Sequence, residues 1–314
     1  MDEFSFIAKY LKPLAANFPG SLNLSDDAAV FSPPPGCELV ITKDAITEGV
    51  HFLGSEPPAL IAEKALRVNL SDLASMGATP LCYFMALILP RTTSEQWLEK
   101  FASGLGATQS EFSIALAGGD TTANDGKLSI SITAIGTVPQ GTALKRSGAR
   151  TGDDIYVSGT LADSAIGLEL LTSSPSPFQV EGRGEGSNFI NRYLTPQPRI
   201  DLGIKLRTVA TSCMDISDGL AQDLSHICTA SNVGAIIYTD KLPTTNIQKA
   251  LTGGDDYELL FTAAPEKAAQ IAQIAKSLQL PLTRIGEITA GNNVKILDAS
   301  GAEIKLSKNG FKHF

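Results

Sequence analysis

The chain has 314 residues, and its 25 Lys and Arg against 33 Asp and Glu give a formal net charge of -8. This length suffices for two domains of ordinary size, and a content of 43% hydrophobic and 18% charged residues describes a folded globular protein rather than a disordered one. Because phosphate backbones are bound by clustered Lys and Arg, the acidic balance argues against a nucleic-acid partner. Small phosphorylated ligands remain compatible if a metal ion supplies the positive charge.

The sequence shows neither an export signal nor a membrane segment. Residues Met1-Asp2-Glu3 begin the chain with acids where a signal peptide needs basic residues. The longest apolar run, 81–89, is too short to span a bilayer. The four cysteines lack paired metal-binding spacing, which favours reduced and mostly buried thiols. We therefore expect a cytoplasmic protein with no membrane partner.

In chain order, the hydrophobic patterns of the first half predict a helix over 1–20, strands over 28–31 and 38–41, a helix over 59–77, a strand over 81–89, a helix over 94–110, and strands over 113–117 and 128–138. A hairpin turn is expected at 124–126. Pro and Gly at 139–141 predict the boundary between a domain over 1–138 and a domain over 139–314.

The second half predicts a strand over 154–158, helices over 161–171, 200–209 and 219–231, and a strand over 235–238. The Gly-, Pro- and Ser-rich segment 173–187 is expected to be a mobile loop. Strands interleaved with helices indicate an α/β fold with α and β layers.

Five short blocks place an aspartate just beyond an apolar stretch, where a strand or helix is expected to end or turn. The acids are Asp26 with Asp27, Asp44, Asp72, Asp120, and Asp215 with Asp218. Taken one at a time, each is better explained as a turn or a helix cap. If they converge, they form a strongly anionic site, and oxygen ligands favour a hard ion such as Mg²⁺ that holds phosphates. The set therefore predicts a metal-bridged phosphate site.

Asp72 has a second property. It continues the helical stripe of Ile61, Ala65 and Val68, so a charge interrupts an apolar face. A buried carboxylate at this position needs a partner.

The other motifs of the sequence indicate the type of reaction less clearly than the aspartate blocks do. No GxxxxGK[ST] loop is present, which excludes an ATP site of the P-loop kind. The basic run 145–150 is either a solvated turn or an Arg clamp for phosphate. His51 taken alone is most simply a satisfied polar residue. The acid-rich turn 253–258 is either a loop cap or a recognition loop for a cation, and no Ser or Cys block supports a hydrolytic triad.

As a set, the blocks resemble the thiamine-monophosphate kinase family, which belongs to the aminoimidazole-ribonucleotide-synthetase-like ATP enzymes. The matching segments are TKD (42–44), EGVHF (48–52), VNLSDLASMGATP (68–80), GGDTT (118–122), KRSGARTGD (145–153), MDISDGL (214–220), TGGDDYELLF (252–261) and GFKHF (310–314). The resemblance spans almost the whole chain in collinear order. It implies a two-domain α/β fold whose N-terminal domains pair in a homodimer. It also implies direct, Mg²⁺-assisted in-line transfer of the ATP γ-phosphoryl group to thiamine monophosphate, which gives thiamine diphosphate and ADP.

The resemblance also assigns site residues. Those matching the family's ligands of several Mg²⁺ ions are Asp27, Thr42, Lys43 (through its backbone carbonyl), Asp44, Asp72, Asp120, Asp215 and Asp218. Of these, the catalytic set is Asp44, Asp72, Asp120 and Asp215. Those matching its nucleotide contacts are Gly119, Asp120, Arg146 and Ser217. Those matching its substrate contacts are His51, Asp255 and Phe311.

Four positions depart from the family's usual residues. Ser25 stands for Gly, Lys43 for Thr, Asp255 for Glu and Phe311 for Trp. The last two bear on substrate affinity more than on reaction type. Two other functions stay open: a related ATP-dependent synthetase, and a non-catalytic protein that binds thiamine phosphates or nucleotides. A selenophosphate synthetase is expected to carry a reactive Cys near the N-terminus, and Cys37 lacks the flanking pattern.

Overall fold

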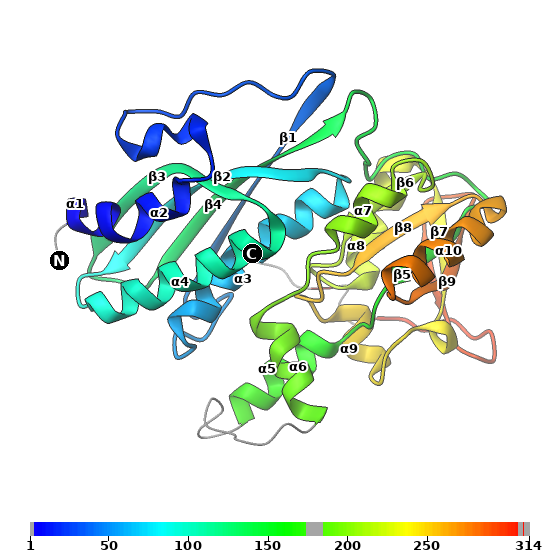
Figure 1. The fold of residues 1–314 in the computed structure, drawn as a ribbon. Helices are drawn as coiled ribbons and strands as arrows, with labels where there is room; N and C mark the ends of the chain where they lie inside the picture. Colours follow the sequence, from blue (N-terminus) through cyan, green and yellow to red (C-terminus); the bar gives the residue numbers. More distant parts are fainter. Residues whose placement is uncertain (1–2, 174–184, 307–309, 311–314) are drawn as a thin grey trace. The chain divides into compact units, whose positions relative to one another are not determined.

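The computed structural model describes residues 3–173, 185–306 and 310. The chain divides into two compact units. One consists of Met1–Leu73 with Ala78–Gly141, and the other of Ala74–Gly77 with Thr142–Phe314. Both units combine a sheet with helices (Figure 1), so the predicted α/β fold is confirmed.

A four-stranded sheet forms the centre of the first unit. Its strands lie in the order β1 (Cys37–Thr47), β4 (Ser129–Pro139), β2 (Thr79–Pro90) and β3 (Ala115–Asn124). β4 pairs antiparallel with both β1 and β2, whereas β3 runs parallel to β2. Every strand that the patterns predicted here from residue 38 onward is present, and each continues beyond its predicted end.

The strand predicted over 28–31 and the hairpin turn predicted at 124–126 are both wrong. Residues 28–31 are not a strand, because the N–H of Val30 donates to the carbonyl of Gly20 (2.8 Å) and the side chain of Val30 is 71% exposed. The turn at 124–126 does not close a hairpin, because β2 lies between β3 and β4 in the sheet. Local turn chemistry identified a turn but not which strands pair.

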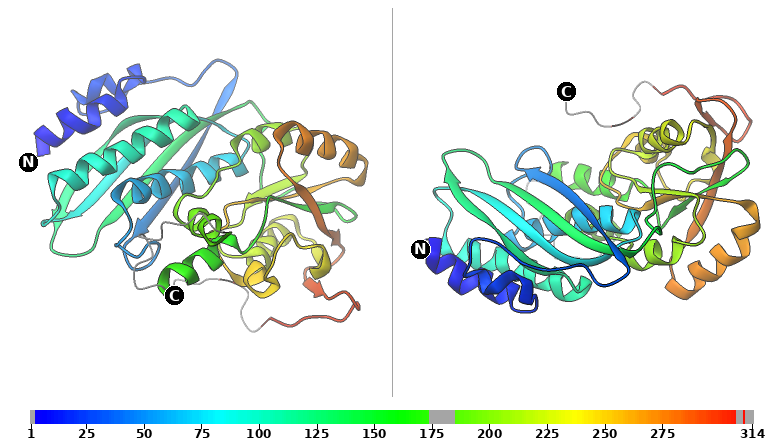
Figure 2. Two further views of the ribbon diagram at one scale, coloured as in Figure 1. Left: turned by 60° about the horizontal axis from the view of Figure 1, so that its bottom comes forward. Right: turned by 90° about the horizontal axis from the view of Figure 1, so that it is seen from above.

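Two long helices, α3 (Pro58–Ser75) and α4 (Glu95–Phe112), cover one face of this sheet (Figure 2). Both were predicted from periodicity. The hydroxyl of Ser94 caps α4 by accepting the N–H of Trp97 (3.2 Å), which satisfies one of the free donors of the first turn.

The helix predicted over 1–20 is shorter and less regular than expected. It consists of α1 (Glu3–Phe6), a π-helical segment η1 (Ile7–Leu11) and α2 (Lys12–Ala15). A 3₁₀ segment, η2 (Pro19–Leu24), follows it after the extended backbone of Phe18, and non-helical backbone angles at Leu22 and Asn23 kink this segment.

The face of the sheet opposite α3 and α4 is less completely covered by other parts of the chain. Phe18 and Phe31 pack there against a small cluster that includes Ile135. Further along that face, Leu39 and Ile41 of β1 are 39% and 61% exposed, since successive side chains of a strand point to opposite sides.

A six-stranded sheet forms the second unit. The order is β10 (Val294–Leu297), β7 (Gly234–Tyr238), β9 (Leu282–Thr289), β5 (Asp154–Ser158), β8 (Leu259–Ala263) and β6 (Ser212–Asp215). Apart from the parallel pair β10 and β7, neighbouring strands are antiparallel. The predicted bounds of β5 agree with the structure.

Helices lie on both faces of this second sheet (Figure 2). They are α5 (Asp163–Ser173), α6 (Glu185–Leu194), α7 (Ile200–Leu206), α8 (Leu220–Ser231), α9 (Ile247–Thr252) and α10 (Ala268–Leu278), with the 3₁₀ turns η3 (Thr239–Lys241) and η4 (Pro265–Lys267). One core contains Ile155 of β5 and Leu224 of α8, and the other contains Tyr156 of β5 and Leu206 of α7. Alternation along β5 therefore supplies side chains to both cores.

The segment 173–187 was expected to be a loop. Residues 174–184 of that segment lie outside the described residues. Ser173 is the last residue of α5, and 185–187 form the first turn of α6, so the loop prediction is wrong for these four residues. None of the helices within 3–173 and 185–306 combines the length and apolar character that a membrane crossing needs.

Candidate active site

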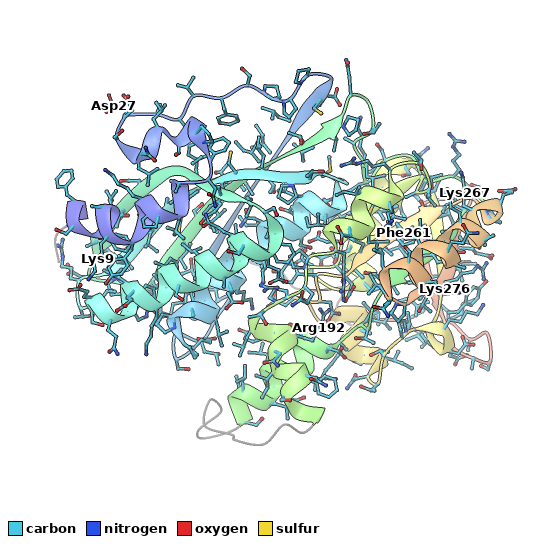
Figure 3. The ribbon with its side chains drawn as sticks, in the orientation of Figure 1. Lys9, Asp27, Arg192, Phe261, Lys267 and Lys276 are labelled. Carbon is cyan, nitrogen blue, oxygen red and sulfur yellow. The ribbon has the colours of Figure 1, made fainter. Side chains whose placement is uncertain are left out.

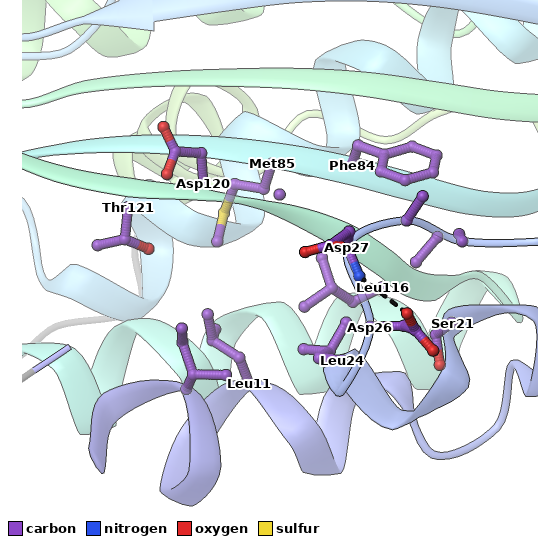
Figure 4. Close-up of a pocket in the computed structure, with 16 residues that line it drawn as sticks. Leu11, Ser21, Leu24, Asp26, Asp27, Phe84, Met85, Leu116, Asp120 and Thr121 are labelled. Atoms are coloured by element: carbon purple, nitrogen blue, oxygen red, sulfur yellow. Dashed lines mark hydrogen bonds between the residues drawn. The ribbon is translucent and has the colours of Figure 1, made fainter. Parts of the chain in front are cut away.

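The first unit contains a pocket of about 530 Å³ beside β3 (Figure 4). Three residues that the sequence assigned to metal or nucleotide line it, namely Asp27, Gly119 and Asp120. Apolar side chains from η1, η2 and the strands form the rest of the wall, among them Leu11 and Met85. The pocket thus combines carboxylates with an apolar surface, as a site for a phosphorylated organic ligand requires.

Gly119 and Asp120 lie inside β3, so the prediction that this strand ends at residue 117, before Asp120, is wrong. A Cβ at Gly119 would lie 2.0 Å from the carbonyl oxygen of Met85 on β2. Close approach of the two strands therefore requires glycine here. The next residue, Asp120, is exposed at the pocket wall.

The partner that Asp72 was predicted to need is Thr42. The hydroxyl of Thr42 on β1 donates to the carboxylate of Asp72 on α3. Nearby, the side-chain oxygen of Asn69 accepts the N–H of Asp44 (3.1 Å), and its amide donates to the carbonyl of Ala65 (3.0 Å). These bonds hold β1, which carries Asp44, against α3, which carries Asp72.

The pKa of the Asp44 carboxyl is also perturbed. Burial raises the pKa of its carboxyl above the ordinary value, because the charged form is less well solvated there. A cation beside Asp44 would favour the charged form and lower this pKa again. Perturbed carboxyls of this kind are common at functional sites.

The oxygen donors of the first unit suit a hard cation. The carboxylates and the Thr42 hydroxyl are ligand types that Mg²⁺ prefers, and the pKa of the half-buried Asp44 is raised by desolvation. In the part of the chain that the structure describes, no three His, Cys, Asp or Glu side chains lie close enough to bind one metal ion. The residues thus fit Mg²⁺ in chemical type, and the ligand set itself stays a prediction.

His51 lies in a loop that several hydrogen bonds hold in place. Its Nδ1 accepts the N–H of Thr47 (3.1 Å), which places the proton of the neutral ring on Nε2. The buried Lys64 on α3 donates to the backbone carbonyl of His51 (3.0 Å). A short bond from the N–H of Gly49 to the carbonyl of Phe52 (2.6 Å) closes the loop. The ring orientation is therefore fixed by its own loop.

In the second unit, β6 ends at Asp215, and the next loop is held by one acid. A single carboxylate oxygen of Asp223 accepts the N–H groups of Ser217, Asp218 and Gly219, at 3.1, 3.1 and 3.2 Å. Burial raises the pKa of Asp223 to about 7, although these three donors favour the charged form. Sequence reasoning missed Asp223, whose only signal is an acid in the first turn of α8.

The acid-rich turn 253–258 pairs with this same loop. The N–H of Asp255 donates to the carbonyl of Ser217, and that of Tyr257 donates to the carbonyl of Ile216, both at 2.8 Å. A Cβ at Gly254 would lie 2.4 Å from the carbonyl oxygen of Ser217, so glycine is required at this contact. The structure thus brings Asp255, a predicted substrate contact, next to Ser217, a predicted nucleotide contact.

The C-terminal block begins beside that loop. A Cβ at Gly310 would lie 2.7 Å from the carbonyl oxygen of Asp218. Phe311, the third predicted substrate contact, lies outside the described residues.

Arg146 is exposed on a well-anchored loop. The N–H groups of Gly148 and Ala149 both donate to the hydroxyl of Ser231 (3.1 Å each). The N–H of Cys213 on β6 donates to the carbonyl of Lys145 (2.8 Å). The loop therefore runs beside β6, the strand that ends at Asp215, and its backbone is held on both sides of Arg146.

Comparison with known proteins agrees with this architecture. Residues 25–138 match the family model described as AIR synthase related protein, N-terminal domain, and residues 150–299 match the model of the corresponding C-terminal domain. The chain is thus composed of the two domains of the AIR synthase related proteins.

Individual relatives narrow the class further. Thiamine-monophosphate kinase of Escherichia coli K12 is 40% identical over 99% of this chain and 98% of its own length. The crystal structure of thiamine-monophosphate kinase from Stenotrophomonas maltophilia K279a has a TM-score of 0.80 and 43% identity over 87% of this chain and 89% of that one. The structure of AaThiL complexed with AMPPCP and TMP has a TM-score of 0.78 and 33% identity over 92% and 91%. This chain belongs to the thiamine-monophosphate kinase family.

Proposed function

We propose that this protein transfers the γ-phosphoryl group of ATP to thiamine monophosphate, giving thiamine diphosphate and ADP. The observation that carries the proposal is full-length similarity at 40% identity to a thiamine-monophosphate kinase, together with the acidic pocket described above. The structure of a relative complexed with AMPPCP and TMP supports the same pair of substrates, because AMPPCP is an analogue of ATP that cannot be cleaved at its terminal phosphate.

Phosphoryl transfer depends on alignment and charge neutralisation rather than on covalent help from the protein. When bound, Mg²⁺ would neutralise the phosphate oxygens and bring the two anionic substrates together. The residues proposed to hold it in the first unit are Asp27, Thr42, Lys43 through its carbonyl, Asp44, Asp72 and Asp120, and those in the second unit are Asp215 and Asp218. The hydrogen bond from Thr42 fixes the carboxylate of Asp72 for this role.

The nucleotide contacts are proposed to be Gly119, Asp120, Arg146 and Ser217. Arg146 is exposed and its loop is anchored, so its guanidinium can turn to a phosphate, whose geometry it matches. The N–H of Ser217 donates to Asp223, so the backbone of Ser217 is held in place on its loop. In this proposal Arg146 and Ser217 position the phosphates without entering a covalent step.

The acceptor contacts are proposed to be His51, Asp255 and Phe311. Thiamine carries a cationic thiazolium ring, for which a carboxylate and an aromatic face are suitable partners. The hydroxyl of Tyr257 donates to Asp255 (3.2 Å) and orients its carboxylate. The Nε2 proton of His51 makes that ring a hydrogen-bond donor.

We also propose the remaining assignments of the sequence. The domains are 1–138, which pairs in a homodimer, and 139–314, which completes the site; exposed Leu39 and Ile41 on the less covered sheet face support the pairing. A cytoplasmic location is supported by four cysteines without disulfides.

The test is a direct assay with purified protein, ATP, Mg²⁺ and thiamine monophosphate, with thiamine diphosphate detected by chromatography. We expect stoichiometric ADP and thiamine diphosphate, and loss of both products when a chelator removes free Mg²⁺. Binding of both ligands with no product would identify a non-catalytic binding protein instead. ADP release that requires a different acceptor would identify a synthetase.

A further inference from the structure

Glu258 is a buried acid that the sequence reading did not single out. Its side chain has no exposed surface. Arg192 Nη2 donates to one carboxylate oxygen (2.6 Å) and Arg199 Nε donates to the other (2.7 Å), while the hydroxyl of Ser158 also donates to the carboxylate. Two guanidinium groups thus offset the cost of burying this charge.

Arg192 makes a second contact, which reaches the turn 253–258 itself. The same Nη2 atom donates to the backbone carbonyl of Asp256 (3.0 Å). Its other terminal nitrogen, Nη1, is buried without a hydrogen-bond partner among the residues that the structure describes. One nitrogen therefore ties both the buried acid and the turn to α6, on which Arg192 lies (Figure 3).

The turn needs such support because its backbone is unusual. Asp255 and Tyr257 have φ values of 66° and 52°, in the left-handed region that side-chain-bearing residues rarely adopt. A conformation of this kind persists where the surroundings hold it. The N–H of Ile216 donates to the carbonyl of Glu258 (2.9 Å), so the far end of the turn is held at the residue that Arg192 contacts.

The paired loop has a separate anchor. Asp223 holds the N–H groups from Ser217 to Gly219 and does not take part in the contacts of Arg192. Loss of Arg192 therefore loosens the side that carries Asp255 and leaves the anchor of Ser217 in place.

We propose that Arg192 is a positioning residue for the acceptor substrate: through Glu258 and the carbonyl of Asp256 it holds Asp255 in its binding geometry. The inference rests on the proposed function for its consequence in catalysis. Its structural part, the dependence of the turn on Arg192, stands independently of that function.

The kinetic test compares Arg192→Ala, Arg192→Lys and the wild-type protein. Arg192→Ala should raise KM for thiamine monophosphate about tenfold while KM for ATP and kcat stay within about twofold. Arg192→Lys should restore most of the loss, because one nitrogen makes both contacts. Arg284→Ala is the matched control, since Arg284 pairs with Asp154 elsewhere on the same sheet.

A second measurement does not depend on activity. Amide hydrogen exchange at Asp255 and Tyr257 should accelerate about tenfold or more in Arg192→Ala and stay unchanged in Arg284→Ala. Unchanged exchange together with unchanged KM would overturn the inference. Equal increases in both KM values with a general loss of stability would also overturn it, because they would indicate a purely structural role. A wild-type protein that makes no thiamine diphosphate would contradict the proposed function, and the exchange measurement would still decide the role of Arg192.

Discussion

Asp256 should make the stability of the second unit depend on pH. Its side chain is 1% exposed, one carboxyl oxygen accepts the N–H of Ala162 (2.9 Å), and the other has no hydrogen-bond partner within the described residues. Burial raises its pKa from 3.8 to about 8. The group is thus protonated in the folded state at neutral pH and ionised in the unfolded state.

The direction and size of the effect follow from this difference. Between the two pKa values the folded state binds more protons than the unfolded state, so stability is greatest below the unfolded pKa and falls as pH rises towards about 8. At about 1.4 kcal/mol for each pH unit, the loss between pH 6 and pH 8 is about 2 kcal/mol. Asp256→Asn imitates the protonated acid at every pH and removes this loss.

The assay is calorimetric unfolding of wild type and Asp256→Asn at the two pH values. For a unit of this size, 1 kcal/mol corresponds to about 2–4 °C in Tm. Wild type should therefore lose about 4–8 °C more than the variant between pH 6 and pH 8. Titrations elsewhere affect both proteins equally and cancel in the comparison. Equal shifts, or a variant less stable than wild type at pH 8, would refute the reasoning.

Three further predictions concern the proposed site. Asp72→Asn should lower turnover about 100-fold or more with little change in Tm, because it removes a charge proposed to bind metal but keeps the oxygen that accepts from Thr42. Near-normal turnover would contradict the metal assignment. Asp223→Ala should lower the free energy of unfolding by about 3 kcal/mol and raise KM for ATP, since three N–H groups lose their acceptor. Asp223→Asn should lower the free energy of unfolding by less than half as much. Equal losses for the two variants in urea titrations would count against this. Gly119→Ala should lower the free energy of unfolding by about 3 kcal/mol or more, because its Cβ would lie 2.0 Å from a carbonyl oxygen of β2. At Gly126 the nearest atom to such a Cβ is 3.6 Å away, so Gly126→Ala should be tolerated. Equal Tm values for the two variants would contradict the close-approach argument.

Much of the fold could be predicted from local patterns. Apolar periodicity located α3 and α4, and a short apolar run located β5 with its observed ends. Such patterns succeed because one face of each helix and most of each central strand must be buried. They failed at 28–31, where an apolar run packs as an irregular segment, and at Gly119, which was expected to lie beyond the end of a strand and instead lies within one.

The candidate site shows the same division. Motifs in the sequence named the carboxylates, the exposed Arg146 and the family, because these depend on residue type and order along the chain. They did not name the residues that hold those groups in place. Asn69, Asp223 and Arg192 became visible only through their hydrogen bonds.

The sequence by itself therefore determined many of the elements and the chemical groups that the protein offers, whereas β6, α6 and the elements after β7 were not predicted. Only the tertiary structure decided how strands pair and which partner each buried charge has. β3 lies beside β2 rather than beside β4. Asp72 on α3 accepts a hydrogen bond from Thr42 on β1, which is 30 positions away in the chain. Both facts depend on contacts between distant segments, whose free energy is gained only when the whole unit is folded. No local pattern carries that information, because the same residues could satisfy their local preferences with other partners.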